Sequence, residues 1–448
     1  MLSVEQAKDR AVDLITRARR AGADASDVVY SGDASAQVAV RLGALEDVER
    51  SENEDIGVRV FVGKRSASAS TSDFSPDALN ALAERVVAMA RQAPDDAFAG
   101  LAPSKMLFEE TPPDLQIDDG AEIPSAKLRE RALEAEDAAR AVRGITNSEG
   151  ASGSTGRAVR ALATSHGFLG GYTGSNHSVS VSVIAGEAST MQTDYAYHTA
   201  RYVKDLEASG GIGRLAAERA VMRLNPTKPK SGPMPIILDP RVSSSLLGHL
   251  VGAITGSAIA RKTSFLIDKL EQAIFASGIN VIDDPLRKRG MRSRPFDGEG
   301  LETRPTKIID DGVLTGWLME SASARQLGLN PTGHAVRGSS GAPGVSTSNL
   351  HMEAGSVSPA DLMADIKLGF YVTDLIGSAI NGLTGDYSRG AAGFLIEDGE
   401  IRGAVAEVTI AGNLIDMFSR VIPANDLEFR YATNAPTVRI DGMTLAGD

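Results

Sequence analysis

Hydrophobic positions recur with helical spacing in residues 243–262, SSSLLGHLVGAITGSAIARK. The spacing predicts one amphipathic helix, with serines at its start that can accept amide hydrogen bonds and Arg261 and Lys262 at its negative end. The face opposite the apolar stripe carries one histidine and then small residues: His249, Gly252, Ala253, Gly256 and Ser257. This helix therefore presents a bare surface beside a single histidine.

Helical spacing also recurs before and after this segment. Ser3 and Ser75 are expected N-caps, and Gly22 is expected to end the first helix. The predicted helices span residues 3–21, 76–92, 125–143, 206–224 and 359–368.

Elsewhere apolar and polar residues alternate, which is typical of strands with one buried face. Residues 28–72 predict a small antiparallel sheet of three strands. Residues 145–204 predict a second antiparallel sheet, rich in Ser, Thr and Tyr. Beyond residue 231 the chain is dense in glycine and short strands, which indicates an open or barrel-like antiparallel sheet around the helix that leads it.

Two segments read as boundaries between these elements. Residues 94–124, rich in Pro, Asp and Gly, are expected to form a linker or exposed arm, and KPKSGP at 228–233 is the clearest break. We therefore expect a multidomain α+β protein. Its three parts are an N-terminal α/β sandwich domain at 1–103, a middle α+β domain with the linker at 104–230, and a C-terminal β-rich, barrel-like domain led by a helix at 231–448.

Composition narrows the classes of function. The 448 residues include 46 basic and 58 acidic side chains, a net charge of −12 that argues against direct nucleic-acid binding. The one dense basic run, 287–294, is expected to be a solvated loop. The first residues contain no apolar signal region, and the longest mostly apolar run, 246–260, is shorter than the roughly 20 residues of a membrane helix. We expect a cytoplasmic protein with no membrane partner.

The sequence contains no pattern of metal ligands. There is no cysteine, so no thiolate can bind zinc or act as a nucleophile. No two of the six histidines lie three to five residues apart, and His249 is followed by Leu250, so no element presents a ligand pair. We predict no metal site in this chain, and a neutral, hydrogen-bonded His249 at a helix–sheet contact.

Two other segments carry side chains that are candidates for chemistry. TGDYSRGAAGFLIEDG at 384–399 is either a bulged hairpin or a bend that projects Asp386 and Arg389 into a cleft able to pair with an extended peptide. The carboxylates of Asp297, Glu299 and Glu302 lie close in sequence, but nothing near them indicates a perturbed environment, and a solvated loop is expected.

The chain resembles the TldD/PmbA family, also described as modulators of DNA gyrase, and is most similar to its PmbA (TldE) branch. The resemblance rests on LLGHLVGAITGSAIARKTSFL, PFDGEGLETR, ILDPRV, LTGDYSRGAAGFLIEDGEI and VTIAGNL, and it extends over nearly the whole sequence. It implies an N-terminal α/β domain, a middle domain and a β-rich C-terminal domain.

In the TldD branch the leading helix of the last domain carries a His-Glu-x-x-x-His motif, and a late cysteine completes the zinc site. The corresponding residues here are Gly248, His249 and Ala253, and the cysteine's region, 431–437, has none. The resemblance therefore implies that the metal ligands and the general base are absent from this chain.

By this resemblance the chain is the subunit of a two-component zinc protease that has no cofactor of its own, and zinc resides in a TldD-like partner. Substrates would be unfolded peptides, and the cleft candidates are His249, His334, Asp386 and Arg389. One alternative is a homodimeric peptide-binding scaffold without enzymatic activity, since a homodimer of the isolated chain is plausible. Another is an independent hydrolase built on His249, His334 and Asp386.

Overall fold

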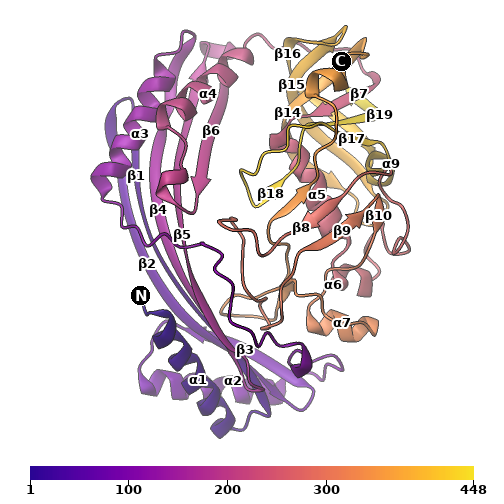
Figure 1. Ribbon diagram of the computed structural model, residues 1–448. Coiled ribbons are helices and arrows are strands. Elements are labelled where there is room, and N and C mark those ends of the chain that lie inside the picture. The colour runs from indigo at the N-terminus through magenta and orange to yellow at the C-terminus, as the bar shows by residue number, and fades with distance from the viewer. Residues whose placement is uncertain (448) are drawn as a thin grey trace.

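The computed structural model describes residues 1–447, and its first half is built on one curved antiparallel sheet (Figure 1). The strand order is β3-β2-β1-β4-β5-β6. The strands are β1 Ala25–Arg41, β2 Ala44–Val62, β3 Arg65–Thr71, β4 Ile145–Thr164, β5 Leu169–Ala185 and β6 Gln192–Ala200. The prediction of a small separate sheet in residues 28–72 is wrong, because β1 pairs with β4 from Asp27 opposite Thr164 to Val40 opposite Ala151.

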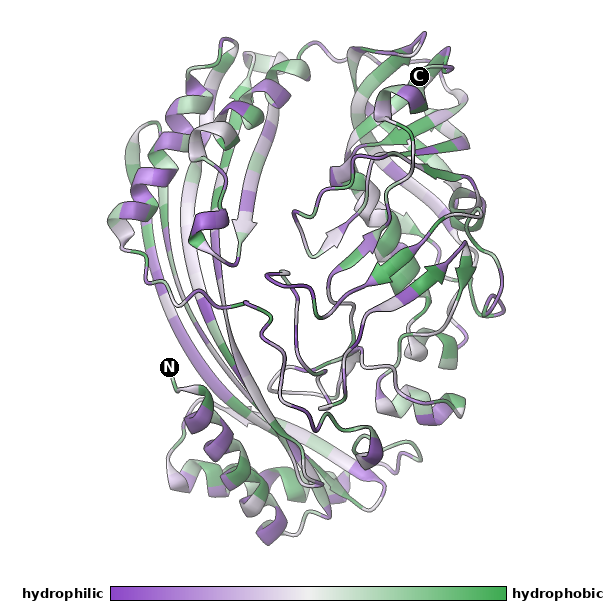
Figure 2. Cartoon of the chain, in the orientation of Figure 1, coloured by the Kyte–Doolittle hydropathy of each residue, from purple (hydrophilic) through white to green (hydrophobic). Residues whose placement is uncertain are grey.

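Four helices cover the convex face of this sheet, two at each end of its long strands (Figure 1). Val28 of β1 packs in the core beneath α1 and α2, and Val40 of the same strand packs beneath α3 and α4. Figure 2 shows hydrophilic residues on the outer sides of these helices. They are α1 Val4–Ala21, α2 Pro76–Gln92, α3 Ser125–Arg140 and α4 Ser209–Met222, each within a predicted helical segment.

The ends of the first two helices follow from local sequence. Ser3 caps α1 in a reciprocal arrangement with Gln6, and Gly22 ends it with a φ of 102°. Ser75 caps α2, and Pro76 occupies its first turn, where a missing amide costs nothing. These caps confirm the predicted starts of both helices.

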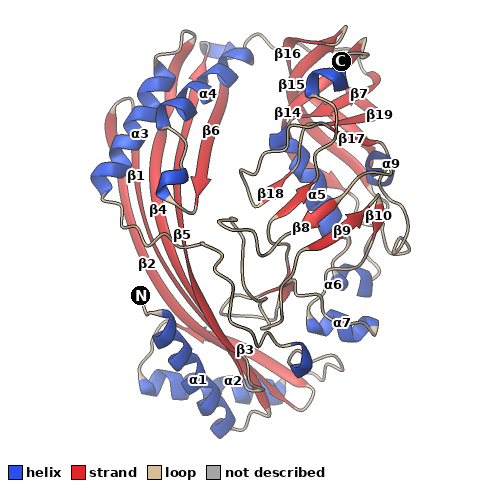
Figure 3. Cartoon of the chain, in the orientation of Figure 1, coloured by secondary structure: helices blue, strands red, loops and turns tan. Residues whose placement is uncertain are grey.

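The second half contains a closed barrel of five strands, visible at the upper right of Figure 3. β16 pairs with both β15 and β19, which joins the two ends of the sheet, and β17 adds to β19 outside the ring. Only β7 and β14 run parallel; the other barrel pairings are antiparallel. The strands are β7 Gly232–Leu238, β14 Leu368–Ile380, β15 Asp386–Glu397, β16 Glu400–Asn413, β17 Val421–Pro423 and β19 Val438–Ala446. The predicted α+β class with a barrel-like C-terminal part is confirmed.

A smaller sheet and short helices lie between the barrel strands in sequence. The sheet has the order β10-β9-β8-β13-β18 and contains one parallel pairing, β13 with β18. These elements are β8 Val281–Asp283, β9 Thr306–Asp310, β10 Val313–Leu314, β11 Ala335–Val336, β12 Gly344–Val345, β13 Leu350–Met352, β18 Thr433–Asn434, α7 Ser321–Leu327, α8 Pro359–Met363 and α9 Leu414–Ser419.

The helix predicted at 243–262 is two helices, α5 Pro240–Ala253 and α6 Gly256–Ala260. The break lies at Thr255, which is extended, pairs with Leu318 and caps α6 by accepting the amide of Ala258. A single helix is prevented because the backbone on both sides of Thr255 bonds to Leu318.

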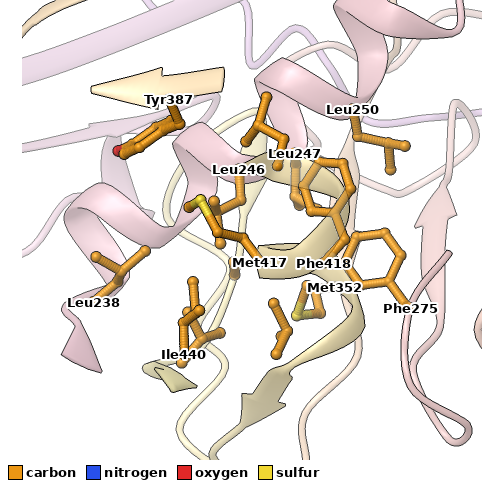
Figure 4. Packing of buried hydrophobic residues seen from close by; sticks show 14 of the residues in the cluster. Leu238, Leu246, Leu247, Leu250, Phe275, Met352, Tyr387, Met417, Phe418 and Ile440 are labelled. Atoms are coloured by element: carbon orange, nitrogen blue, oxygen red, sulfur yellow. The ribbon is translucent and has the colours of Figure 1, made fainter. Parts of the chain in front are cut away.

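The start of α5 also differs from the prediction. Asp239 is the N-cap and Pro240 occupies the first turn, so the serines lie inside the helix. Ser243 instead donates to the carbonyl of Pro436 at 2.8 Å. On the inner face Leu246 and Leu247 pack with Met417 and Phe418 in the main core of the second half (Figure 4).

The two halves meet at both ends of the large sheet. At one end Phe296 contacts Phe168 and Tyr172, with ring centroids 4.8 and 5.6 Å apart, and Arg59 and Arg337 both bind the buried Asp27. At the other end Asp194 of β6 accepts from Arg223, at 3.2 Å, and from Arg241 of α5, at 2.9 Å. The charged contact between Arg241 and Asp194 therefore fixes α5 relative to β6.

Residues 94–124 are not simply an exposed linker. Leu115 and Ile117 are buried, and the Ile117 carbonyl accepts the amide of Ser175 on β5. The guanidinium of Arg325 donates to three carbonyls of this segment, those of Phe98, Gly100 and Leu101. No helix within residues 1–447 is long and apolar enough to cross a membrane.

Candidate functional site

The outer face of α5 is open at the positions that carry no side chain. Gly248 and Gly252 are exposed, and a Cβ placed on either would meet no atom within 4 Å. Ala253, by contrast, is only 7% exposed and belongs to the core. Gly248 therefore borders open space, whereas Ala253 does not.

His249 lies on the same helix against the barrel. Its ring meets Tyr387 of β15 edge-on, with centroids 5.8 Å apart. Its Nε2 atom is buried and has no hydrogen-bond partner within residues 1–447, contrary to the hydrogen bond that we predicted. Burial lowers the pKa of His249, and the positive charge of Arg389 lowers it further, so the imidazole is neutral at neutral pH.

Arg389 faces this histidine and Tyr387. Its guanidinium donates to the carbonyls of Gly377, at 2.7 Å, and Leu375, at 3.3 Å, and so bridges β15 to β14. Burial raises the pKa of Tyr387 to about 12, so its hydroxyl is protonated beside Arg389. The structure thus brings together two of the candidate residues, His249 and Arg389.

The other two candidates lie apart from this pair. Asp386 is exposed, and its carboxylate accepts hydrogen bonds from Thr384 and Asn413, which lower its pKa. His334 is buried against Asp283, with 3.4 Å between Nε2 and Oδ2, and contacts Thr332. It lines a separate cavity of about 520 Å³.

Residues 384–399 form a hairpin whose pairing contains bulges. The register between β14 and β15 shifts after Val372 and again after Ile376. This matches the plainer of the two interpretations of the glycine-rich segment. The bend does not direct Asp386 toward His249.

The side chains do not fit a zinc ion. Within residues 1–447 no three His, Cys, Asp or Glu side chains converge as a metal site would require. At the α5 motif positions Gly248 and Ala253 offer no donor atom, and His249 offers a single nitrogen. No metal-dependent step can be assigned to these residues.

Two adjoining cavities lie between the halves, where α5 begins. One, of about 310 Å³, and the other, of about 280 Å³, share Tyr197 of β6, Arg219 of α4, Arg241 of α5 and Tyr431. Sequence reasoning missed these residues. The alternating tyrosines of QTDYAYHT were the available signal, since Tyr195 and Tyr197 share one face of β6.

Two loops expected to be solvated are partly buried instead. In the basic run, Arg287 stacks on Phe429 with 3.4 Å to the ring centroid, and Arg289 pairs with Asp205 and lies over Tyr202. The run therefore connects the loop to neighbouring elements by charge and stacking.

The loop that contains Asp297, Glu299 and Glu302 differs more from its prediction than the basic run does. Asp297 is 2% and Glu299 5% exposed, whereas Glu302 is exposed as expected. Asp297 accepts backbone amides of the same loop, and Glu299 accepts both the amide and the hydroxyl of Ser321. Burial, with the Asp297 charge second, raises the pKa of Glu299 to about 7.

Family models match most of the chain. The PmbA/TldA metallopeptidase domain 1 matches residues 26–90, the central domain matches 118–224, and the C-terminal domain matches 231–447.

Relatives with similar sequences carry the same family name. The metalloprotease PmbA of Escherichia coli O157:H7 is 38% identical over 426 residues, which cover 95% of this chain and 92% of the relative. A PmbA homolog of Haemophilus influenzae is 35% identical and covers 99% of this chain and 96% of the relative.

Solved structures share the fold over nearly the whole length. A candidate modulator of DNA gyrase from Bacteroides thetaiotaomicron aligns with a TM-score of 0.91 at 27% identity, with all of both chains covered. TldE from Thermococcus kodakarensis aligns with a TM-score of 0.87 over 98% of this chain and all of that one, and at 21% identity it supports the fold alone.

Proposed function

The chain belongs to the PmbA/TldD metallopeptidase family, in its PmbA/TldE type, and from this membership we propose that it is the metal-free subunit of a two-component zinc protease. The catalytic zinc would lie in a TldD-type partner that keeps the His-Glu-x-x-x-His motif. This chain would form one side of a chamber in which unfolded peptides are held and cut.

The observation that carries the proposal is the outer face of α5. At the motif positions it has Gly248, His249 and Ala253, and the space beside Gly248 is open. A zinc peptidase needs three protein ligands and a base that activates water, and this helix supplies at most one nitrogen. The open face suits a wall that leaves room for a peptide.

The edge of the large sheet supports a role in holding peptides. β6 is an edge strand of that sheet and borders the cavity next to α5. An unpaired strand edge can bind an extended peptide through main-chain hydrogen bonds, which are independent of sequence. Such recognition suits a protease that accepts many unfolded chains.

The proposal is tested by purifying this chain alone, a TldD-type protein alone and the two together, and by assaying an unstructured peptide with and without a zinc chelator. We expect chelator-sensitive cleavage only when the motif-bearing protein is present, together with co-elution of the two proteins. Chelator-sensitive cleavage by this chain alone would overturn the proposal. Absence of any association would favour the homodimeric scaffold.

A pair of matched variants tests the role of the α5 face. Gly248→Gln fills the open space and is expected to lower cleavage by the two-protein assembly several-fold without lowering the melting temperature. Gly211→Gln is the control, because Gly211 is also a helical glycine with no atom within 4 Å of a Cβ, but it lies on α4. Equal activity of both variants would show that the α5 face does not border the chamber.

A further inference from the structure

The cavity of about 310 Å³ at the start of α5 has a positively charged lining. It contains three arginines and no carboxylate. Its lining residues come from β6, α4, α5, the loop after β8 and the segment leading into β18, and those used below are Tyr195, Tyr197, Arg219, Arg241, Arg292 and Tyr431.

Arg219 is only partly compensated by its surroundings. Within residues 1–447 its guanidinium donates one hydrogen bond, to the carbonyl of Tyr195 at 3.4 Å, and forms no ion pair with a carboxylate. Burial lowers its pKa and the nearby charge of Arg241 lowers it further, and the more distant charges of Asp239 and Asp194 offset this only in part. A half-buried guanidinium without a counter-ion favours an anion beside it.

The other two arginines differ in how they are compensated. Arg241 already binds Asp194, with 2.9 Å between Nη1 and Oδ1. The side chain of Arg292 has no hydrogen bond or ion pair within the described chain, although its backbone amide donates to Asn349. Two guanidinium groups around the cavity therefore remain available to a ligand.

The walls add aromatic surface to this charge. The rings of Tyr195 and Tyr197 stack with centroids 6.2 Å apart, and the Tyr197 ring lies 5.4 Å from that of Tyr431. A guanidinium group binds a planar carboxylate with two parallel hydrogen bonds. Aromatic rings provide an apolar surface for the carbon atoms attached to that carboxylate. The cavity thus suits a carboxylate attached to an organic chain.

The neighbouring cavity distinguishes a carboxylate from a phosphate. It continues from the first past Arg219 and is lined by acidic groups as well: Asp239, Asp426 and Glu428. Arg219, Arg241 and Arg430 line it too, so its charges are balanced, and a monoanion needs less further compensation there than a dianion. The connected space also leaves room for the rest of a peptide chain.

We propose that this cavity binds the free C-terminal carboxylate of a peptide, with Arg219 and Arg292 as the guanidinium donors. The inference rests on the proposed function, because it specifies which end of the peptide substrate this subunit binds. Peptides would enter the chamber with their C-terminus fixed between β6 and the start of α5. The substrate class is then unfolded peptides with a free carboxyl end.

The test measures binding of an N-terminally labelled hexapeptide to the full-length chain by fluorescence anisotropy, first with a free carboxyl end and then with an amidated one. We expect the amide to bind about tenfold more weakly, because it loses charge-assisted hydrogen bonds. Arg219→Gln should weaken binding of the acid to the level of the amide and leave the amide unaffected. Equal affinity of acid and amide for the unmodified chain would overturn the proposal.

Two variants separate binding from folding. Arg292→Gln changes an exposed side chain without a partner and should weaken binding of the acid peptide while the melting temperature stays unchanged. Arg214→Gln, on the exposed side of α4, is the matched control and should change neither the binding of the acid peptide nor the melting temperature. If Arg214→Gln weakens the acid peptide as much as Arg219→Gln does, general charge attraction explains the binding and the subsite is refuted.

Competition with inorganic phosphate and with acetate identifies the anion. Displacement of the peptide by phosphate at concentrations where acetate has no effect would overturn the carboxylate assignment in favour of a phosphate site. The binding assay uses this chain alone, so it is decided independently of proteolysis. Equal binding of acid and amide peptides by this chain, together with cleavage of both by the two-protein assembly, would refute the subsite and leave the subunit role intact.

Discussion

Gly248 and Gly252 lie inside a helix where most side chains would be tolerated. Neither has a neighbour within 4 Å of a Cβ, and neither has a left-handed φ. Glycine in a helix interior is less favourable than alanine because it loses more backbone entropy on folding. Their presence is therefore a cost to stability, and the proposed peptide chamber, which needs open space beside α5, gives a reason for it.

Gly248→Ala and Gly252→Ala are each expected to raise the free energy of unfolding by about 0.5–1 kcal/mol. Chemical denaturation followed by circular dichroism measures this difference. The matched substitution Gly213→Ala should destabilise, because a Cβ at Gly213 would lie 2.0 Å from the Ala135 carbonyl oxygen. Destabilisation by the α5 substitutions would show that the helix face is occupied.

The raised pKa of Glu299 predicts that the stability of the fold depends on pH. Its pKa is raised to about 7 by burial and by Asp297, so folding favours the protonated carboxyl. The stabilisation is complete below the ordinary value of 4.5 and is lost as the pH rises through about 7. The melting temperature should therefore fall between about pH 5 and about pH 8, and Glu299→Gln should reduce that fall.

Differential scanning calorimetry across this pH range checks the Glu299 prediction. Glu302→Gln is the control, because Glu302 is exposed in the same loop, and it should leave the slope unchanged. If the melting temperature of the Glu299→Gln variant falls with pH as steeply as that of the unmodified protein, other groups cause the pH dependence.

Single residues were predicted unevenly from the sequence. The bare positions on α5 were visible because Gly248 and Gly252 lie on the face opposite its apolar stripe. The burial of Glu299 was not, since it depends on Ser321 and Arg59, which are distant in the chain. The unpaired Arg219 was equally hidden, because the absence of a counter-ion is a property of the folded chain.

At the scale of elements, α5 depends on one carboxylate at its start. Asp239 accepts the amide of Arg241 at 2.9 Å and the hydroxyl of Tyr371 at 3.0 Å. It therefore both caps the helix and ties it to β14. The serines that the sequence offered as caps lie one turn further on.

Asp239→Ala is expected to lower the free energy of unfolding by about 1–3 kcal/mol, since it removes the cap and leaves Tyr371 without its acceptor. Asp239→Asn should lower the free energy of unfolding clearly less, because an amide oxygen also caps a helix and accepts a hydrogen bond. Denaturant titrations of both variants compare these losses. Equal losses would indicate that the negative charge near Arg241 matters more than capping.

Helices of the first half were predicted well because their caps and apolar stripes are local. The break between α5 and α6 was missed because it arises from the pairing of Thr255 with Leu318, which lies far along the chain. The many short strands of the second half have no long period that a sequence pattern can reveal. Their number and the density of glycine between them indicated a barrel-like sheet.

At the scale of the whole molecule, Asp194 connects the two halves. Its carboxylate is 2% exposed and accepts from Arg223 and Arg241, which are 15% and 13% exposed. A buried carboxylate shared by two guanidinium groups cannot be removed without leaving charge uncompensated. The position of β6 relative to α5, and so the cavity between them, depends on this contact.

Asp194→Ala is expected to lower the free energy of unfolding by about 3 kcal/mol, because Arg223 and Arg241 lose their buried partner and keep only the longer contacts, of 3.4 Å, to Asp374 and Asp239. It should also speed proteolytic cleavage in residues 224–231, between α4 and β7, as measured by limited digestion. Asp205→Ala, which removes the exposed pair with Arg289, should cost less than about 1 kcal/mol. Similar losses in the two variants would show that Asp194 does not hold the halves together.

The pairing of β1 with β4 determines how the gene can be divided. A fragment that ends at residue 103 would leave the β1 edge without its neighbour from Asp27 to Val40. Long exposed strand edges recruit other chains, so such a fragment should precipitate or self-associate when expressed. The shortest N-terminal fragment that keeps every strand of the sheet and its covering helices extends through α4 to Met222.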